Sequence, residues 1–132
     1  MEHAIPELVD SFLRRPNPAV ITCIKPDGYP MPVATWYDWD GERVLVNMDA
    51  RRSRLAWMRE NPKVGFTVLG DNWYQHVSFT GDVVAIEEDQ DLADIDLLST
   101  RYTGRRFRNR NAHRVSAWIV PRIWHVWELD RK

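Results

Sequence analysis

The chain has 132 residues and a net charge of −1, which suits one domain spanning 1–132 with its own hydrophobic core. This charge balance creates no overall attraction to nucleic acid or to membranes, so neither is expected as a partner. No stretch is long and apolar enough to cross a bilayer. Met1 to Asp10 lacks the apolar centre of a secretory signal, so we expect a cytoplasmic protein.

The chain opens with a pattern that predicts a helix. Apolar residues recur at helical spacing at Ile5, Leu8, Val9, Phe12 and Leu13. Pro6 suits the first turn of this helix, and Pro16 and Pro18 are expected to stop it.

Three strands are predicted next, over 19–24, 31–39 and 43–48. Pro26-Asp27-Gly28 forms a turn between the first two, and Asp40-Gly41 is a strong hairpin signal between the second and the third. The single cysteine, Cys23, lies in the first apolar run. It is expected to be a buried small hydrophobic residue rather than a reactive thiol.

A short helix and two strands follow. Ser53 is predicted to cap a helix that runs to Glu60 and ends at Asn61-Pro62. Strands are predicted over 64–69 and 73–86, and Gly81 marks a bulge or a bend in the longer one.

The last quarter of the chain predicts one helix and two closing strands. The helix covers 92–102, and the strands cover 114–120 and 123–129, divided by Pro121. Several strands joined by tight turns favour a barrel, so the fold class is mainly β with short helices (α+β).

One segment predicts binding chemistry. Arg51, Arg52 and Arg54 crowd the start of the predicted helix at Ser53, where the helix dipole is already positive. A bound anion would remove this mismatch, because exposed amides, a hydroxyl and arginine side chains together hold phosphate well. The alternative is a basic turn whose arginines extend into water.

Asp49–Val64 resembles the phosphate-binding segment of the pyridoxamine-phosphate-oxidase-like superfamily. Other segments of the family match in the same order along the chain: Pro26–Val33, Tyr37–Gly41, Val77–Val84 and Arg114–Trp127. The resemblance implies a six-stranded split β-barrel of the FMN-binding type. It also implies a homodimer with cofactor sites at the subunit interface.

The resemblance also implies which residues bind the cofactor. They are Ala34, Thr35, Trp36, Asn47, Met48, Arg52, Ser53, Arg54, Trp73 and Tyr74. Arg52, Ser53 and Arg54 would contact the cofactor phosphate, and residues 34–36 would lie along the ring system. Trp73 or Tyr74 would come from the other subunit.

Within this family the sequence looks more like the branch that uses the deazaflavin coenzyme F420 than the branch that uses FMN. The arginine run, residues 101–114, supports that choice independently through Arg101, Arg105, Arg106, Arg108, Arg110 and Arg114. Coenzyme F420 carries a phosphodiester, a lactyl carboxylate and an oligoglutamate tail, which such a run could hold. Alternatively, these arginines pair with the acidic segment, residues 87–96.

Seven tryptophans indicate either an aromatic cleft or subunit interface, or a core rich in large rings. His3, His76, His113 and His125 show no metal-ligand spacing, so no metal site is expected. His76 and His125 are expected to point into a core or a cleft. Neither a nucleophile elbow nor a glycine-rich dinucleotide loop is present.

These features predict an oxidoreductase that transfers a hydride between coenzyme F420 and a small unsaturated organic substrate. The alternatives are an FMN-dependent oxidoreductase of the same fold and a non-catalytic flavin- or deazaflavin-binding protein. The sequence assigns no catalytic side chain, because the cofactor ring does the chemistry in such enzymes. The proton donor to substrate could be Tyr37, Tyr74, His76 or water.

Overall fold

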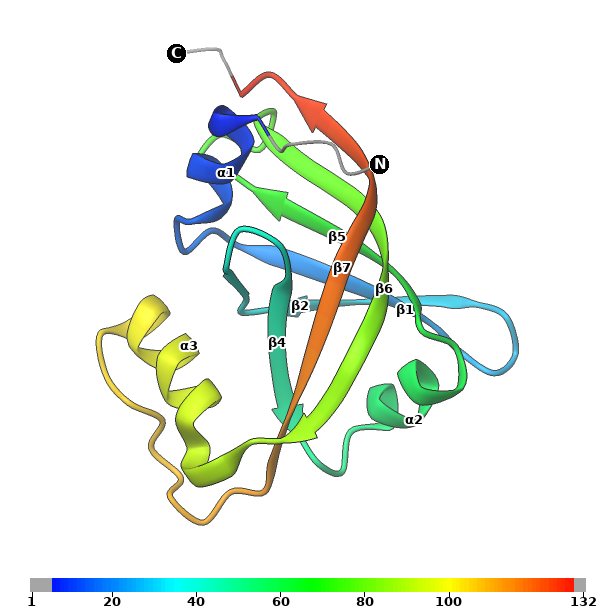
Figure 1. Ribbon diagram of the computed structural model, residues 1–132, viewed down its shortest axis with the longest axis vertical. Helices are drawn as coiled ribbons and strands as arrows, with labels where there is room; N and C mark the ends of the chain where they lie inside the picture. Colours follow the sequence, from blue (N-terminus) through cyan, green and yellow to red (C-terminus); the bar gives the residue numbers. More distant parts are fainter. Residues whose placement is uncertain (1–5, 130–132) are drawn as a thin grey trace.

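The computed structural model describes residues 6–129, so the predictions for His3 and Ile5 lie outside the described residues. The described part forms one antiparallel sheet with three short α-helices (Figure 1). The strands are β1 (Ala19–Ile24), β2 (Pro30–Thr35), β3 (Asp38–Trp39), β4 (Val44–Asp49), β5 (Lys63–Leu69), β6 (His76–Glu88) and β7 (Arg114–Trp127). The helices are α1 (Glu7–Leu13), α2 (Ser53–Glu60) and α3 (Ala93–Thr103), with a 3₁₀ turn at Gln90–Leu92 before α3.

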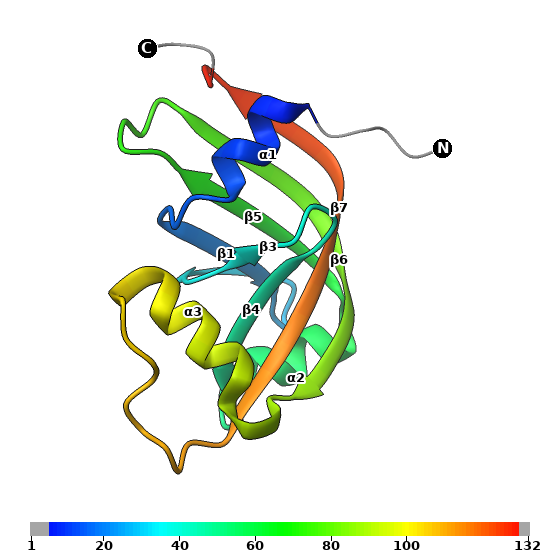
Figure 2. The same cartoon turned by 60° about the vertical axis from the view of Figure 1, so that its left-hand side comes forward.

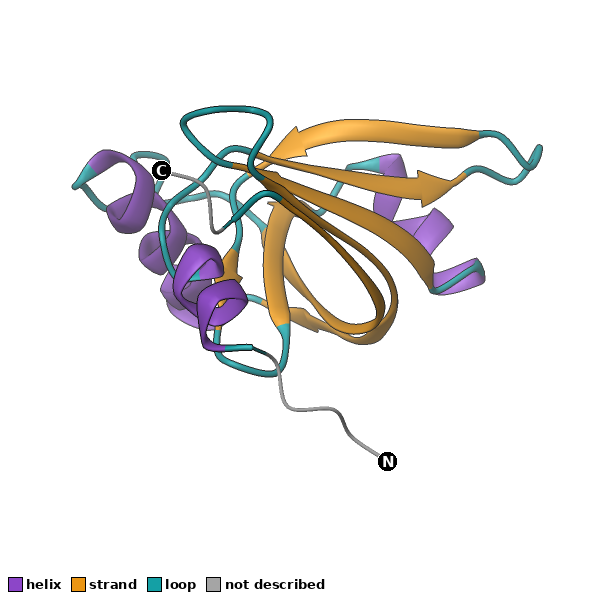
Figure 3. Ribbon diagram, turned by 90° about the horizontal axis from the view of Figure 1, so that it is seen from above, coloured by secondary structure: helices purple, strands orange, loops and turns teal. Residues whose placement is uncertain are grey.

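The sheet runs in the order β2-β1-β5-β6-β7-β4-β3 and curls into a split barrel (Figure 3). Its two edge strands, β2 and β3, are separated in the chain by only Trp36 and Tyr37. Three Cα steps span at most about 11 Å, so the sheet must bend until its edges come close. This short connection explains why the sheet forms an open barrel rather than a flat layer.

The strand count differs from the six that the resemblance implies. The sheet contains seven strands, because the predicted strand 31–39 is divided into β2 and the two-residue β3. The break falls where Tyr37 turns inward, and its hydroxyl lies 2.8 Å from the Leu13 carbonyl and 2.9 Å from the Arg15 carbonyl. Tyr37 is therefore fully buried between the barrel and the end of α1.

The prediction of two closing strands divided by Pro121 is wrong, since β7 is continuous from Arg114 to Trp127. β4 pairs with β7 only as far as Ile119, so the missing N–H of Pro121 breaks no bond on that side. On the other side Pro121 faces Gly81, where the β6–β7 register shifts. A Cβ at Gly81 would lie 2.5 Å from the Val120 carbonyl oxygen, which explains the glycine and confirms the predicted bulge.

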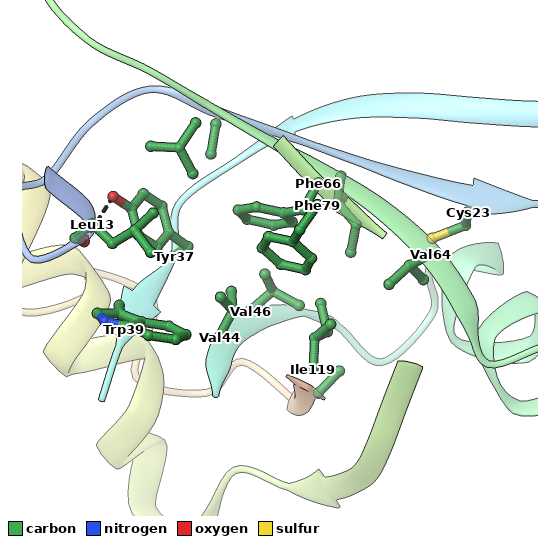
Figure 4. Packing of buried hydrophobic residues seen from close by; sticks show 14 of the residues in the cluster. Leu13, Cys23, Tyr37, Trp39, Val44, Val46, Val64, Phe66, Phe79 and Ile119 are labelled. Carbon is green, nitrogen blue, oxygen red and sulfur yellow. Dashed lines mark hydrogen bonds between the residues drawn. The ribbon is translucent and has the colours of Figure 1, made fainter. Parts of the chain in front are cut away.

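The core fills the inside of the barrel, because alternate residues of each strand point inward. Figure 4 shows Phe66 and Phe79 stacked at its centre with their ring centroids 5.3 Å apart. Cys23 is 1% exposed and packs in this core, as the sequence predicted, and burial raises the pKa of its thiol.

The helix boundaries agree with the sequence within a few residues, but one cap does not. Ser53 is the first residue of α2, and the extended Arg52 precedes it with no side-chain capping bond. The prediction that Ser53 caps this helix is therefore wrong. Pro6 likewise precedes α1 rather than lying in its first turn, and α1 ends at Leu13, before Pro16.

α3 lies alongside β4 and has a small apolar cluster of its own (Figures 1 and 2). Leu92, Ile95 and Leu98 form this cluster, against which Trp36 and Phe107 pack. Arg101 ties the end of α3 to α1, because its guanidinium donates to the carbonyls of residues 13, 14, 15 and 37 over 2.6–3.1 Å. Polar contacts therefore hold α3 against the barrel as well as apolar packing.

Within residues 6–129, no helix is both long and apolar enough to pass through a membrane.

Candidate functional site

A pocket of about 560 Å³ lies between α3 and the barrel. Its volume falls within the range of roughly 300–1,000 Å³ that is typical of small-molecule sites. The pocket is lined by Pro16, Pro18, Ala19, Ala34, Thr35, Trp36, Asn47, Met48, Asp49, Arg52, Arg54, Ile95, Leu98, Tyr102, Phe107 and Arg114.

Three arginines form the basic group of the pocket: Arg52, Arg54 and Arg114. Arg52 and Arg54 stand at the start of α2, where the unpaired amides of the first turn add positive potential. The Arg54 Nε is buried and has no hydrogen-bond partner among the described residues. Burial is the main reason that the pKa of the Arg54 guanidinium is lowered. A buried cationic donor without a partner is costly unless a ligand pairs with it.

Aromatic side chains form another wall of the pocket: Trp36, Tyr102 and Phe107. The rings of Trp36 and Tyr102 stack with centroids 5.5 Å apart and planes 11° apart. The Tyr102 hydroxyl donates to the Asn17 carbonyl at 2.7 Å, so the ring is held at both its face and its tip. Such a wall suits a flat ring system.

One carboxylate also lines the pocket, but its oxygens are engaged. Asp49 accepts bonds from the side chain of Arg51 at 3.0 and 3.2 Å and from the Arg51 backbone N–H at 2.9 Å. These bonds hold the Asp49 pKa well below its usual range, so the group is a carboxylate at neutral pH. The free polar groups of the pocket are therefore mainly cationic, which favours an anion.

The structure brings together most of the residues that the sequence predicts for the site. Those that line the pocket are Ala34, Thr35, Trp36, Asn47, Met48, Arg52 and Arg54. Ser53 adjoins them in the chain but does not line the pocket. Trp73 and Tyr74 lie in the loop before β6, stacked on each other at 4.2 Å, and neither lines the pocket of its own chain. Their predicted contribution to the partner's site stays a prediction.

Comparison with known proteins decides the family. The chain matches the family described as pyridoxamine 5'-phosphate oxidase over residues 5–128. The chain belongs to the pyridoxamine 5'-phosphate oxidase family. No curated protein matches the chain.

Several solved structures resemble this family member. A structure described as an F420 reductase is 30% identical, with a TM-score of 0.83, covering 92% of this chain and 98% of the other. A conserved hypothetical protein of Mycobacterium tuberculosis is 26% identical, with a TM-score of 0.76, covering 95% and 85%. A putative pyridoxamine 5'-phosphate oxidase of Listeria innocua, 16% identical over 89% and 94% with a TM-score of 0.68, shares the fold.

The pocket of this pyridoxamine 5'-phosphate oxidase family member also contains residues that the sequence did not assign to it. Tyr102 had a place only in the helical pattern, whereas Arg114 began a predicted closing strand and belonged to the arginine run. Phe107 lies between arginines in that run and gave no signal of its own. Tyr102 and Phe107 approach β4 because α3 folds back over the barrel, and Arg114 does so because β7 pairs with β4. No local pattern encodes either arrangement.

The structure separates the arginines of the run into different roles. Arg110 pairs with Asp96 of the acidic segment at 2.7 Å, and His113 pairs with Glu88 at 2.7 Å. Arg105, Arg106 and Arg108 are exposed, and no ion pair of theirs with any residue of 6–129 is found. The proposed pairing of the run with the acidic segment is thus seen for Arg110 alone among the arginines.

His76, His113 and His125 lie within the part of the chain that the structure describes. Within the described residues no group of three or more histidine, cysteine, aspartate or glutamate side chains could hold a metal ion. His76 and His125 stack with Trp127 at centroid distances of 6.3 and 5.7 Å, and His125 also lines a second, smaller pocket on the sheet.

Proposed function

We propose that the protein is an oxidoreductase that transfers a hydride between coenzyme F420 and a small unsaturated organic substrate. Membership of the pyridoxamine 5'-phosphate oxidase family and the 30% identity to an F420 reductase support an oxidoreductase with a flavin-type cofactor. The observation that carries the proposal is the pocket itself. It joins an aromatic wall to a basic group that includes the unpartnered Arg54 Nε.

The residues present fit such a cofactor. Arg52 and Arg54 would hold its phosphate, since both line the pocket at the start of α2. Ala34, Thr35 and Trp36 would lie along its ring, with Met48 closing the site at the end of β4. Bound there, the cofactor would supply a hydride carrier.

The arginine run favours coenzyme F420 over FMN. Phe107 lines the pocket, and its neighbours Arg106 and Arg108 are exposed without an ion pair among the described residues. Coenzyme F420 has carboxylates beyond its phosphodiester, whereas FMN ends at its phosphate. Exposed arginines beside the pocket would attract those carboxylates.

The protein's own side chains leave proton delivery to solvent. The hydroxyl of Tyr37 is buried against backbone carbonyls and does not line the pocket, and burial raises the pKa of that group. The Tyr102 hydroxyl proton is committed to the Asn17 carbonyl. Asp49 is ionised at neutral pH. Tyr74 and His76 do not line the pocket of their own chain. Because hydride addition to an unsaturated bond also requires a proton, we propose that water provides it.

We further propose that the protein is a cytoplasmic homodimer in which Trp73 or Tyr74 of one subunit approaches the pocket of the other. Large apolar side chains are exposed on β6, β7 and the loop before β6. They include Trp73 at 65%, Tyr74 at 54%, Ile123 at 72% and Trp127 at 46%. An exposed apolar area of this kind is typical of a subunit interface. Sedimentation at micromolar protein should give a dimer, and a monomer would contradict this arrangement.

Turnover tests the enzymatic part of the proposal. Purified protein should oxidise reduced coenzyme F420 in the presence of an unsaturated acceptor. The return of the oxidised deazaflavin's absorbance measures this reaction. A panel of enones, imines and quinones samples the substrate class. Turnover with reduced FMN alone would identify the FMN-dependent alternative. Tight cofactor binding with no turnover across the panel would identify a non-catalytic binding protein.

A further inference from the structure

We propose that Arg114 is a third anion-binding residue of the pocket and that Asn47 acts by positioning it rather than by contacting the cofactor. The inference rests on the proposed function, because it assigns a further residue that binds an oxyanion of the cofactor's anionic arm. The family resemblance implied a cofactor contact for Asn47 and assigned no role to Arg114. The contacts of the two side chains indicate different roles for them.

Arg114 is placed to receive an anion. It is the first residue of β7, lines the pocket and stands opposite Asp49 in the β4–β7 ladder. Its Nε donates to the Asn47 Oδ1 at 2.9 Å, and its guanidinium lies 4.9 Å from the centroid of the Phe107 ring. No hydrogen bond from its terminal nitrogens to any residue of 6–129 is found. Those two nitrogens therefore remain for a ligand.

Asn47 has no amide hydrogen left to donate to an anionic ligand. Its Nδ2 donates to the Asp89 Oδ2 and to the Ser116 Oγ, each at 3.0 Å. Its Oδ1 accepts from Arg114. Both amide hydrogens are thus occupied by protein groups, and the oxygen, which can only accept, offers nothing to an anion. What the side chain presents to Arg114 is one fixed acceptor.

A buried network fixes the orientation of that amide. Ser116 is 1% exposed, and its Oγ donates onward to the Asp94 Oδ2 at 2.6 Å. Asp89 is 8% exposed and also accepts from the backbone N–H groups of Asp94 and Ile95 at the start of α3. With Asp89 and Ser116 held this way, the Asn47 amide cannot turn around without losing bonds. Arg114 is therefore oriented before any ligand arrives, which lowers the entropic cost of binding.

The charges around Arg114 leave it able to attract an anion. Burial lowers the pKa of the Arg114 guanidinium, and the charges of Arg52 and Arg54 lower it further. The carboxylates of Asp49 and Asp89 act in the opposite direction, but both already accept from other donors. An oxyanion between the three arginine side chains would relieve their repulsion. The oxyanion is either the cofactor's phosphate or a carboxylate that follows it.

Paired cofactors that differ only in their anionic arm test the assignment. FMN and riboflavin share a ring but not the phosphate. Coenzyme F420 and its phosphate-free deazaflavin core differ by the whole arm. We expect Arg114→Ala to weaken the binding of at least one charged compound about ten-fold or more. The binding of both uncharged compounds should be unaffected. Loss for both FMN and coenzyme F420 assigns Arg114 to the phosphate, and loss for coenzyme F420 alone assigns it to a following carboxylate.

The quantity to compare is the ratio of the affinity for a charged compound to the affinity for its uncharged partner. Asn47→Ala should lower this ratio in the parent protein. It should have no further effect on the ratio in the Arg114→Ala variant. That non-additivity identifies a positioning residue. Arg122→Ala is the matched control, because Arg122 is an exposed arginine of the same strand outside the pocket. Equal ratios for parent and Arg114→Ala, or an undiminished Asn47→Ala effect in the double variant, would overturn the proposal.

A ring-free probe separates this inference from the proposed function. Inorganic pyrophosphate should raise the Tm of the parent more than that of Arg114→Ala, whether or not any flavin binds. If parent and variant respond equally, Arg114 is not an anion-binding residue. If pyrophosphate distinguishes them but neither ring compound binds the parent, the cofactor assignment fails while the role of Arg114 stands.

Discussion

Two arginine-rich regions look alike in the sequence and differ in the structure. Arg51, Arg52 and Arg54 crowd the turn before α2, and a second group occupies the arginine run. At the first turn Arg54 is half-buried with an unpartnered Nε in a pocket. In the run, Arg105, Arg106 and Arg108 are exposed, whereas Arg101 and Arg114 are half-buried and hold fixed partners.

The difference shows that the surroundings of an arginine, rather than its local count, decide its role. A desolvated guanidinium must find an acceptor, so Arg101 becomes a structural tie and Arg54 a candidate ligand-binding group. A hydrated one attracts anions only through a screened field. The same run of sequence therefore contains structural, binding and surface arginines, and substitutions should separate them.

The largest effect should come from the structural tie. Arg101→Ala removes the donors to four backbone carbonyls at the junction of α1, β3 and α3. Bonds from a charged donor contribute about 1.5–3 kcal/mol each when removed. Because the four bonds share one guanidinium and their contributions are not additive, we expect the free energy of unfolding to fall by at least about 3 kcal/mol. Chemical denaturation measures this change. Arg105→Ala is the control, and an equal effect of both variants would remove the distinction.

The next effect should appear at the buried binding arginine. Arg54→Met keeps much of the apolar side chain and removes the charge. Cofactor affinity should fall about ten-fold or more, because a charge-assisted bond to phosphate is lost. The Tm of the free protein should stay level or rise, since a buried donor without a partner disappears. Arg59→Met, at the exposed end of the same helix, should change neither quantity. Unchanged affinity in Arg54→Met would exclude Arg54 from the site.

A smaller effect is expected from the exposed arginines. Replacing Arg105, Arg106 and Arg108 together with alanine should weaken the binding of coenzyme F420 several-fold and leave the binding of FMN unchanged. The salt dependence of coenzyme F420 binding should fall with it, because charges in water are screened over about 8 Å at physiological ionic strength. Titrations at low and high salt test this. If the triple variant binds coenzyme F420 like the parent, these arginines do not hold the tail.

The smallest effect concerns the surface pair Arg110–Asp96. The Arg110 side chain lowers the pKa of Asp96 below its ordinary value of 3.8. A lowered folded-state pKa means that the pair stabilises the protein above pH 3.8 and loses this contribution as the pH falls further. Arg110→Ala should destabilise the protein only slightly near neutral pH, and less once Asp96 is protonated, when only the Arg110 bond to the Phe107 carbonyl is left to lose. Unfolding curves at several pH values check this, and a difference between parent and variant that does not shrink at low pH would refute it.

Sequence patterns predicted the barrel well, because its information is local. Alternating apolar residues and turn signals located β1, β4 and β5 within about one residue, and Gly81 indicated the bulge. Pro121 misled the prediction of β7, because its effect depends on whether a neighbouring strand needs the missing N–H. That neighbour, β4, is more than seventy residues away in the chain.

The candidate site was predicted in part for the same reason. Residues 34–36 lie at the end of β2 and residues 47–54 run from β4 into α2, and both segments line the pocket. Each is a short continuous segment, so the family resemblance could assign its residues to the site together. Tyr102 reaches the pocket only because α3 folds back over β4, held by Asp89 at one end and by Arg101 at the other. Arg114 reaches it because β7 pairs with β4. Such contacts join distant parts of the chain and leave no local pattern.

Side-by-side titration of the parent protein with coenzyme F420 and with FMN tests the central claim most directly. The pocket is proposed to hold the phosphate of a flavin-type cofactor at Arg52 and Arg54 and to favour the longer anionic arm of the deazaflavin. We predict saturable binding of both compounds, with coenzyme F420 the tighter of the two. Tighter binding of FMN would contradict the choice of cofactor, and binding of neither would contradict the assignment of the pocket.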